Sequence, residues 1–231
     1  MGLDTAKYLT AEGARVMVTG RTPANLEAAA AELGESAVVV ASDAASLTDI
    51  DALAARVRES FGRLDALVLN AGSARPVPFE VVSPQEYDDT FAVNARGPFF
   101  TVQRLADLIA PGGAVVLITS VGDVQGDPNF APYNAAKAAL RSEARSMARA
   151  LLPRRIRVNA VSPGPIETTL ISRAGLPVEV EQEVRVGLRE SNPTGRFGTG
   201  DEIARAVAFL AFDATFTTGA ELPVDGGLTQ V

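Results

Sequence analysis

Two side chains four residues apart, Tyr133 and Lys137, could do chemistry together. The chain has 231 residues, and Lys7 and Lys137 are its only lysines. On a helix, residues i and i+4 lie one turn apart on the same face, so the ammonium can approach the phenol. A nearby positive charge lowers a phenol pKa from its usual value of about 10. The spacing therefore indicates a tyrosine that acts as acid and base. The alternative is a buried aromatic residue followed by a solvated lysine.

The composition excludes several classes of function. The chain is 47% hydrophobic and 21% charged, which is ordinary for a single globular domain of this length. A net charge of −7 argues against nucleic acid or an anionic membrane as a partner. Cysteine and histidine are absent, which excludes disulfides and histidine-based triads and predicts no metal site. Because we find no long apolar run and no signal peptide, we expect a cytoplasmic protein.

Strand-like and helical patterns alternate along the chain. Short apolar runs predict strands at Arg15–Thr19, Ala37–Ala41, Ala66–Asn70, Ala114–Thr119, Ile156–Val161 and Glu221–Val224. Helices are predicted at Gly2–Glu12, Pro23–Leu33 with Thr22 as its cap, Ser46–Phe61, Ser83 to Ile109 with a break, Ala131–Leu152, and from a Thr199–Glu202 capping box to about Phe212.

This alternation predicts an α/β fold in which a doubly wound parallel sheet carries helices on both faces. We expect residues 1–231 to form one domain. The segment from Pro163 to Gly198 is rich in glycine, proline and charge, and we predict that it is an irregular, mobile lid over the substrate.

Five motifs in a fixed order carry a resemblance to a known family. They are Asn70-Ala71-Gly72, Asn94 within Asn94-Ala95-Arg96-Gly97, Ser120 thirteen residues before Tyr133, the run from Tyr133 to Lys137, and Pro163-Gly164-Pro165 ending at Thr168. The chain resembles the classical short-chain dehydrogenases/reductases from Gly2 to its end. The resemblance implies a Rossmann-like fold and hydride transfer between a nicotinamide cofactor and a carbonyl/alcohol substrate.

The resemblance implies a role for each of four residues. Tyr133 would protonate the forming alkoxide in reduction, or take the hydroxyl proton in oxidation. Ser120 would orient the reacting oxygen by a hydrogen bond. Lys137 would lower the tyrosine pKa and hold the nicotinamide ribose, and Asn94 would position a water that links Lys137 to solvent. Taken singly, Asn94 could be a helix kink or a surface amide, and Ser120 a turn residue at a strand end.

A dinucleotide site is also implied. Arg21 replaces the acidic residue that would bind a free ribose 2′-hydroxyl, and an arginine can pair with a 2′-phosphate. NADP(H) is therefore favoured over NAD(H), unless Arg21 is simply an exposed residue. The implied cofactor contacts are Gly2, Arg21, Asp43, Asn70, Ala71, Gly72, Tyr133, Lys137, Pro163, Gly164, Ile166 and Thr168. The substrate pocket is expected to be lined by Val121, Asp123, Gln125, Phe130 and Leu170.

The N-terminal end departs from the family pattern. The family begins with a strand and a glycine-rich turn, and here only the last glycine of that turn has a counterpart, Gly2. The absent strand would lie between Arg15–Thr19 and Ala66–Asn70, leaving a gap of about 9.6 Å, or two strand spacings, with unpaired ladder groups. We therefore expect impaired NADP(H) binding and turnover. Three explanations of this departure remain open. Either the first residue is an internal methionine of an ordinary enzyme, or the protein is naturally truncated and closes its sheet differently, or the cofactor site works through its remaining contacts.

Two functions remain possible from the sequence. The first is an NADP-preferring oxidoreductase acting on a carbonyl/alcohol pair, which the intact set of site residues favours. The second is a catalytically silent scaffold or regulatory protein built on the same fold, which the N-terminal departure favours. A homodimer or homotetramer is expected, formed through the helices at Phe99–Ile109 and Ala131–Leu152 and through the C-terminal strand region.

Overall fold

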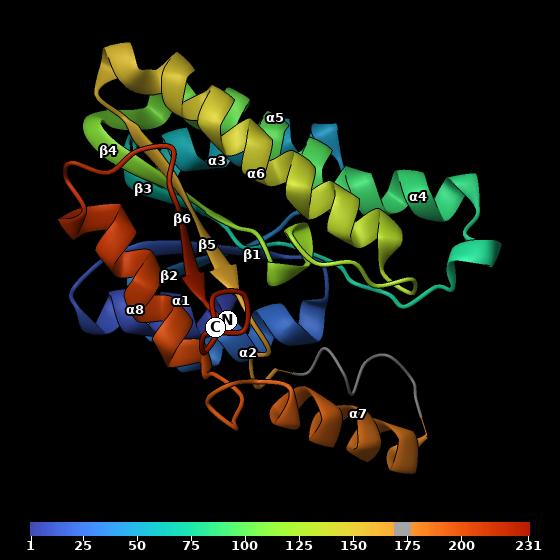
Figure 1. Ribbon diagram of the computed structural model, residues 1–231. Coiled ribbons are helices and arrows are strands. Elements are labelled where there is room, and N and C mark those ends of the chain that lie inside the picture. Colours follow the sequence, from blue (N-terminus) through green and yellow to red (C-terminus); the bar gives the residue numbers. More distant parts are fainter. Residues whose placement is uncertain (169–176) are drawn as a thin grey trace.

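The structure is a computed structural model that describes residues 1–168 and 177–231. Helices and parallel strands alternate in the predicted order (Figure 1). The strands are β1 (Val16–Gly20), β2 (Ala37–Ala41), β3 (Leu64–Leu69), β4 (Ile109–Ile118), β5 (Arg157–Pro163) and β6 (Glu221–Val224). The helices are α1 (Gly2–Ala11), α2 (Pro23–Leu33), α3 (Leu47–Ser60), α4 (Pro84–Phe91), α5 (Gly97–Leu105), α6 (Ala131–Leu151), α7 (Val178–Glu190) and α8 (Gly200–Ala208).

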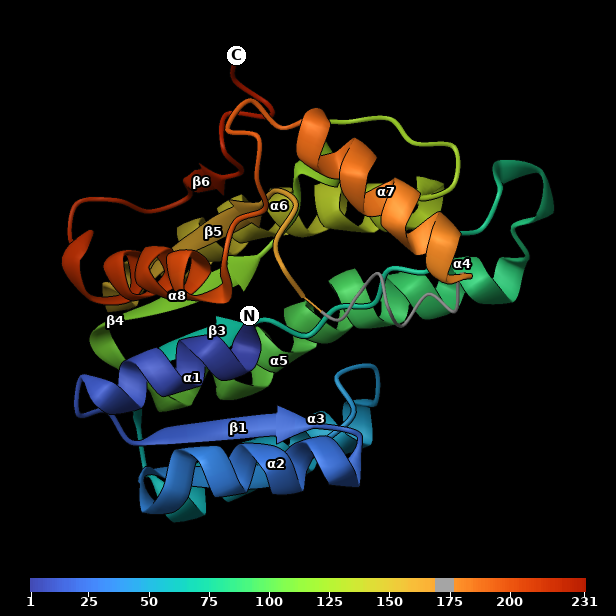
Figure 2. The same cartoon turned by 90° about the horizontal axis from the view of Figure 1, so that it is seen from below.

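The strands form two parallel sheets instead of one. In the first, β1 pairs with β2, and in the second the order is β3-β4-β5-β6. Within the described residues no strand lies between β1 and β3, and Figure 2 shows β1 set apart from β3 and β4. The gap therefore falls where the sequence predicted it.

Both faces of the larger sheet are covered by helices, as predicted (Figure 1). Residues alternate between the two faces of a strand. On β4, Val115 and Leu117 pack with the α6 side chain Leu140 on the face of α5 and α6. Val116 and Ile118 pack on the opposite face, in a cluster with α8. These side chains are almost fully buried, and each such burial stabilises the fold by roughly 1.5–3 kcal/mol.

Apolar side chains, not hydrogen bonds, join the two sheets. Met17 of β1 packs with Leu64 and Leu67 of β3 in a cluster completed by α3 and α5. Val16 and Val18 of β1 pack with α1 and α2 in a second cluster. The smaller sheet is thus held to the rest of the molecule by packing on both of its faces.

Three local expectations are wrong. The helix predicted to reach Ile109 ends earlier, because Ile109 is the fully buried first residue of β4. Thr22 stands at the N-cap of α2 but makes no capping hydrogen bond through its side chain. The predicted lid is not irregular throughout, because it contains the 13-residue helix α7.

Leu170 lies among residues 169–176, outside the described residues, and the mobility of the lid stays a prediction. No helix in the described part of the chain combines the length and the apolar character that crossing a membrane requires.

Candidate active site

The fold brings the predicted site residues to one edge of the parallel strands. Arg21 follows β1, Asp43 follows β2, Asn70 follows β3, Ser120 follows β4 and Gly164 follows β5. In open α/β sheets, ligands bind outside the carboxyl ends of the strands. The first two turns of α6 add Tyr133 and Lys137 to this edge.

Tyr133 and Ser120 form the centre of the site. The Ser120 hydroxyl lies within hydrogen-bonding reach of the Tyr133 phenol. Its Oγ also accepts a hydrogen bond of 3.1 Å from the backbone N–H of Gly122. A Cβ at position 122 would collide with the side chain of Asn134 on α6. Glycine therefore lets the turn after Ser120 lie directly against α6.

The pKa of Tyr133 is raised, contrary to the sequence-based expectation. Burial of the phenol is the largest cause, and the charge of Asp123 acts in the same direction. The hydrogen bond with Ser120 lowers the pKa, but does not offset the burial. At neutral pH the phenol consequently holds its proton.

Lys137 is buried beside the phenol. Its Nζ donates a hydrogen bond of 2.8 Å to the carbonyl oxygen of Ile118 and lies 5.8 Å from the centre of the Tyr133 ring. Only 3% of the residue is exposed. Burial lowers the pKa of Lys137 to about 8, an effect that the Asp123 carboxylate partly opposes. Most of the lysine therefore stays charged at neutral pH.

Asn94 is a fully buried residue in a π-helical turn, Ala92–Arg96, between α4 and α5. Its amide nitrogen donates to the carbonyl oxygens of Ser73 (2.8 Å) and Thr90 (2.9 Å), and its Oδ1 accepts from the Ser73 N–H (3.2 Å). This burial excludes the alternative that Asn94 is a surface amide. A Cβ on Gly72 would lie 3.1 Å from Asn94 Oδ1 and 3.4 Å from Lys137 Nζ, so the loop after β3 contacts both side chains.

The remaining predicted contacts lie around this centre. A Cβ on Gly2 would come within 2.5 Å of Asn70 Nδ2, which places the start of α1 against the loop after β3. Arg21 Nη1 lies 3.6 Å from Asp43 Oδ2, and the Arg21 side chain is 61% exposed. The Phe130 ring packs edge-on against the Tyr133 ring, with 6.3 Å between centroids.

The prediction that Asp123 lines the substrate pocket is wrong. Only 1% of its side chain is exposed, and it faces Arg141 of α6 and Glu221 of β6. The reason is local. Asp123 ends the short turn Val121–Asp123, which folds its last side chain towards α6 and β6.

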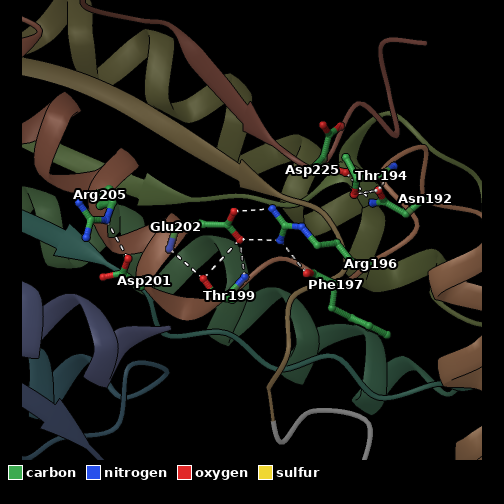
Figure 3. Close-up of polar contacts among 9 residues, drawn as sticks. All are labelled: Asn192, Thr194, Arg196, Phe197, Thr199, Asp201, Glu202, Arg205 and Asp225. Atoms are coloured by element: carbon green, nitrogen blue, oxygen red, sulfur yellow. Dashed lines mark hydrogen bonds and ion pairs between the residues drawn. The ribbon is translucent and has the colours of Figure 1, made fainter.

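A polar network that the sequence did not reveal holds the base of the predicted lid (Figure 3). Arg196 pairs with both oxygens of Glu202, at 2.7 and 3.0 Å. Glu202 also completes the predicted capping box by accepting from the Thr199 N–H at 2.8 Å. Asn192 donates to the carbonyl oxygen of Asp225, just after β6 (2.8 Å). The capping box was the one part of this network with a recognisable sequence pattern.

Comparisons with known proteins agree with this geometry. A family model described as enoyl-(acyl carrier protein) reductase matches residues 1–229. Oxidoreductase asL5 of Sarocladium schorii is 36% identical over 234 residues, covering 100% of this chain and 92% of that protein. A protein of Xanthobacter autotrophicus named inactive 2-(S)-hydroxypropyl-CoM dehydrogenase 2 is 35% identical, over 98% of this chain and 100% of that protein.

Solved structures share the fold. The crystal structure of a short-chain dehydrogenase/reductase of the glucose/ribitol dehydrogenase type, from Brucella melitensis, has a TM-score of 0.87 at 31% identity. The match covers 100% of this chain and 93% of that one. The chain therefore belongs to the short-chain dehydrogenase/reductase family of oxidoreductases, which use a nicotinamide cofactor.

Proposed function

We propose that this protein catalyses NADP(H)-preferring hydride transfer on a carbonyl/alcohol pair, with Tyr133 as the acid/base. The observation that carries the proposal is the contact among a protonated phenol, a serine hydroxyl and a buried ammonium at the carboxyl edge of the strands. The nicotinamide cofactor, when bound, supplies or accepts the hydride. The protein's own residues handle the proton.

The arrangement supports a defined task for each side chain. Because the Tyr133 phenol is protonated at neutral pH, it can give its proton to an alkoxide oxygen as that oxygen gains charge. Ser120 orients the same oxygen by a hydrogen bond. The Lys137 ammonium, 5.8 Å from the tyrosine ring, then stabilises the phenolate left behind. Asn94 fixes the loop beside Lys137, and we propose that it also positions a water there.

The residues present fit a nicotinamide cofactor. An ammonium can donate three hydrogen bonds, and the acceptor of the Lys137 ammonium among the described residues is Ile118 O. Lys137 therefore has the capacity to hold ribose hydroxyls. Gly72 contacts Lys137 and Asn94 through its backbone, where any side chain would narrow the site.

A preference for NADP(H) rests on Arg21. Its guanidinium is mostly exposed after β1, and its one ion pair in the described structure, with Asp43, is a loose contact of 3.6 Å. A 2′-phosphate could therefore engage the guanidinium without breaking a tight pair.

A catalytically silent protein of the same fold is the second candidate. Two observations favour it: a relative that matches over its whole length is named inactive, and β1 and β3 are not paired. The site residues Asn94, Ser120, Tyr133 and Lys137 favour the enzyme. Cofactor binding separates the two candidates, because the silent protein is expected to bind dinucleotide weakly or not at all.

The test is a titration of purified residues 1–231 with NADPH and NADH, followed by nicotinamide fluorescence, and then a screen of carbonyl and alcohol substrates. We expect binding that is impaired by the incomplete glycine-rich turn yet still saturable and tighter for NADPH, and turnover that is lost in Tyr133→Phe. Tyr87→Phe is the matched control, because Tyr87 lies exposed on α4. Absence of binding at millimolar cofactor, or equal turnover by both variants, would refute the proposed enzyme.

We also propose a cytoplasmic homodimer or homotetramer with residues 1–231 as one domain. Exposed apolar side chains on α5 and after α6, Phe99 and Leu152, support the assembly. Light scattering coupled to size exclusion would measure it, and a monomer at all concentrations would contradict it.

A further inference from the structure

A buried charged cluster lies behind the turn that carries Ser120. It consists of Asp123 at the end of that turn, Arg141 on α6 and Glu221 at the start of β6. The exposed side-chain fractions are 1% for Asp123, 30% for Arg141 and 9% for Glu221. None of these three residues has a part in the hydride transfer described above.

Arg141 connects three elements of the fold. Its Nε lies 2.7 Å from Glu221 Oε2, and its Nη1 lies 3.6 Å from Asp123 Oδ2. The other oxygen of Glu221, Oε1, accepts a 2.6 Å hydrogen bond from the Thr119 hydroxyl next to Ser120. The cluster therefore fixes α6 and β6 to both sides of Ser120.

The charges in the cluster do not balance. Two carboxyl groups face one guanidinium, and neither oxygen of Asp123 receives a hydrogen bond from an N–H or O–H group of the described residues. The Asp123 carboxyl lies within hydrogen-bonding reach of Glu221. Two ionised carboxylates cannot hydrogen-bond each other, so a proton between them would satisfy Asp123.

The surrounding groups favour that proton. Burial, followed by the hydrogen bond and charge of Glu221, raises the pKa of Asp123 to about 7. Arg141 and Arg145, both on α6, lower this pKa, but not enough to offset the burial. Tyr133 and Lys137 complete the charged and titratable groups on α6 that interact with Asp123.

The cluster continues the active-site face of α6. Tyr133, Lys137 and Arg141 are spaced by four residues, so they lie on one helical face. Asp123 and Ser120 belong to the same turn. A displacement of Asp123 would therefore move Ser120 relative to Tyr133.

We propose that Arg141 is a positioning residue: through Asp123 and Glu221, which share one proton, it holds the Ser120 turn against α6. The catalytic part of this proposal rests on the proposed function. The shared proton and the ordering of the Ser120 turn do not depend on it. Ionisation of Asp123 as the pH rises then loosens the turn and lowers kcat.

The first experiment measures the turn without any substrate. Hydrogen exchange of peptides covering residues 119–125 is compared between the wild type, Arg141→Met and Arg141→Lys. We expect exchange to rise about tenfold in Arg141→Met, since loss of an ion pair to a buried carboxylate exposes the turn to opening. Arg141→Lys, which keeps the charge, should restore most of the protection. Unchanged exchange in Arg141→Met overturns the proposal.

The second experiment locates the proton. The carboxyl stretching band is followed by infrared spectroscopy from pH 5 to 9 in the wild type, Asp123→Asn and Glu143→Gln. Glu143 is the matched control, because it lies on α6 two residues from Arg141 and burial likewise raises its pKa to about 7, yet it does not belong to the cluster. Each variant should lose one carboxyl that titrates near pH 7. Persistence of both in Asp123→Asn overturns the shared proton.

The third experiment links the cluster to catalysis. In the wild type, kcat should fall as the pH rises through about 7, with little change in KM. Asp123→Asn, which imitates the protonated carboxyl, should remove this decrease, and Glu143→Gln should keep it. A decrease that survives in Asp123→Asn overturns the positioning role. If the wild type turns over no carbonyl or alcohol, the proposed function fails, and the first two experiments alone decide the cluster.

Discussion

At the scale of single residues, the candidate active site conflicts with stability. Tyr133 and Lys137 of this site, and Asp123 behind it, are ionisable groups in buried surroundings, and burial shifts the pKa of each in the direction that favours the neutral form. Buried ionisable side chains of this kind are concentrated at functional sites, and replacing them often stabilises a fold. Lys137 allows this conflict to be measured, because the chain has one other lysine for comparison.

We predict that Lys137→Met stabilises the protein while abolishing turnover. The folded-state pKa of Lys137 is about 8, below its value in an unfolded chain. The cost of burial therefore grows as the pH falls from about 10.4 and is complete below the folded-state pKa. After allowing for the lost hydrogen bond to Ile118, we expect a gain of about 1–2 kcal/mol at pH 7, or a few degrees in Tm.

Thermal melts at pH 7 and pH 10 check this prediction. The gain should shrink at pH 10, because this pH approaches the unfolded-state pKa of about 10.4 and the unfolded chain also begins to lose the proton. Lys7→Met is the control: Lys7 is exposed and paired with Glu32, so its removal should not stabilise the protein at either pH. An equal gain at both pH values for Lys137→Met would show that packing, not charge, is the cause.

Arg21 carries a prediction about the cofactor. Arg21→Ala should weaken NADPH binding by about 10- to 100-fold, because charge-assisted hydrogen bonds to the 2′-phosphate contribute about 1.5–3 kcal/mol. The same variant should change NADH binding little. Arg63→Ala is a matched control, because Arg63 also lies 3.6 Å from its carboxylate partner but precedes β3, at the opposite end of the strand. Equal losses for NADPH and NADH in Arg21→Ala would remove the basis for NADP(H) preference.

At the scale of elements, two helices begin with the same cap in different surroundings. Thr199 and Glu202 form a capping box at α8, and Ser83 and Glu86 form one at α4. The α8 box carries in addition the tight pair with Arg196 (Figure 3). That pair, followed by the Thr199 N–H, lowers the pKa of Glu202 to about 2.

We predict that Glu202→Ala destabilises the protein by about 1 kcal/mol at pH 7, a value reduced by exposure to solvent. Glu86→Ala should cost less, because its arginine neighbour, Arg75, is 3.8 Å away. A lowered folded-state pKa gives stability above the unfolded value of about 4.3, which is lost as the pH falls towards 2. Urea unfolding at pH 7 and pH 3 measures both variants. If the loss in free energy of unfolding caused by Glu202→Ala were as large at pH 3 as at pH 7, the ionised carboxylate would not contribute to stability.

The elements also show how far sequence reasoning reaches. Strands such as Ala37–Ala41 are continuous apolar runs, and their burial follows directly from their composition. Helix α7 was not predicted, because glycine and proline flank it and its valines remain exposed, although Val180, Val184 and Leu188 recur at helical spacing. Tyr133 and Lys137 could be found from local spacing. Glu221 could not, because its partners Asp123 and Arg141 lie 98 and 80 residues earlier in the sequence, respectively.

At the scale of the whole molecule, the two sheets should differ in stability. The strand β1 pairs with one neighbour, β2, and most of its residues are only partly buried. In contrast, β4 pairs with both β3 and β5, and its last five residues are buried. Cooperative units open in order of their local stability. The unit formed by β1, α2 and β2 is therefore expected to open before the larger sheet.

Native-state hydrogen exchange tests this expectation. Peptides from β1 and β2 should exchange through an opening that costs less free energy than global unfolding, whereas β4 and β5 should exchange only through global unfolding. NADPH should slow the exchange of β1 and β2 if Arg21, which follows β1, contacts the cofactor. It should slow β4 as well, because β4 exchanges through global unfolding, which bound ligand makes less favourable. Equal protection of both sheets would mean that the packing of Met17, Val16 and Val18 couples them as strongly as a ladder of hydrogen bonds would. The gap between β1 and β3 would then carry no cost in cooperativity.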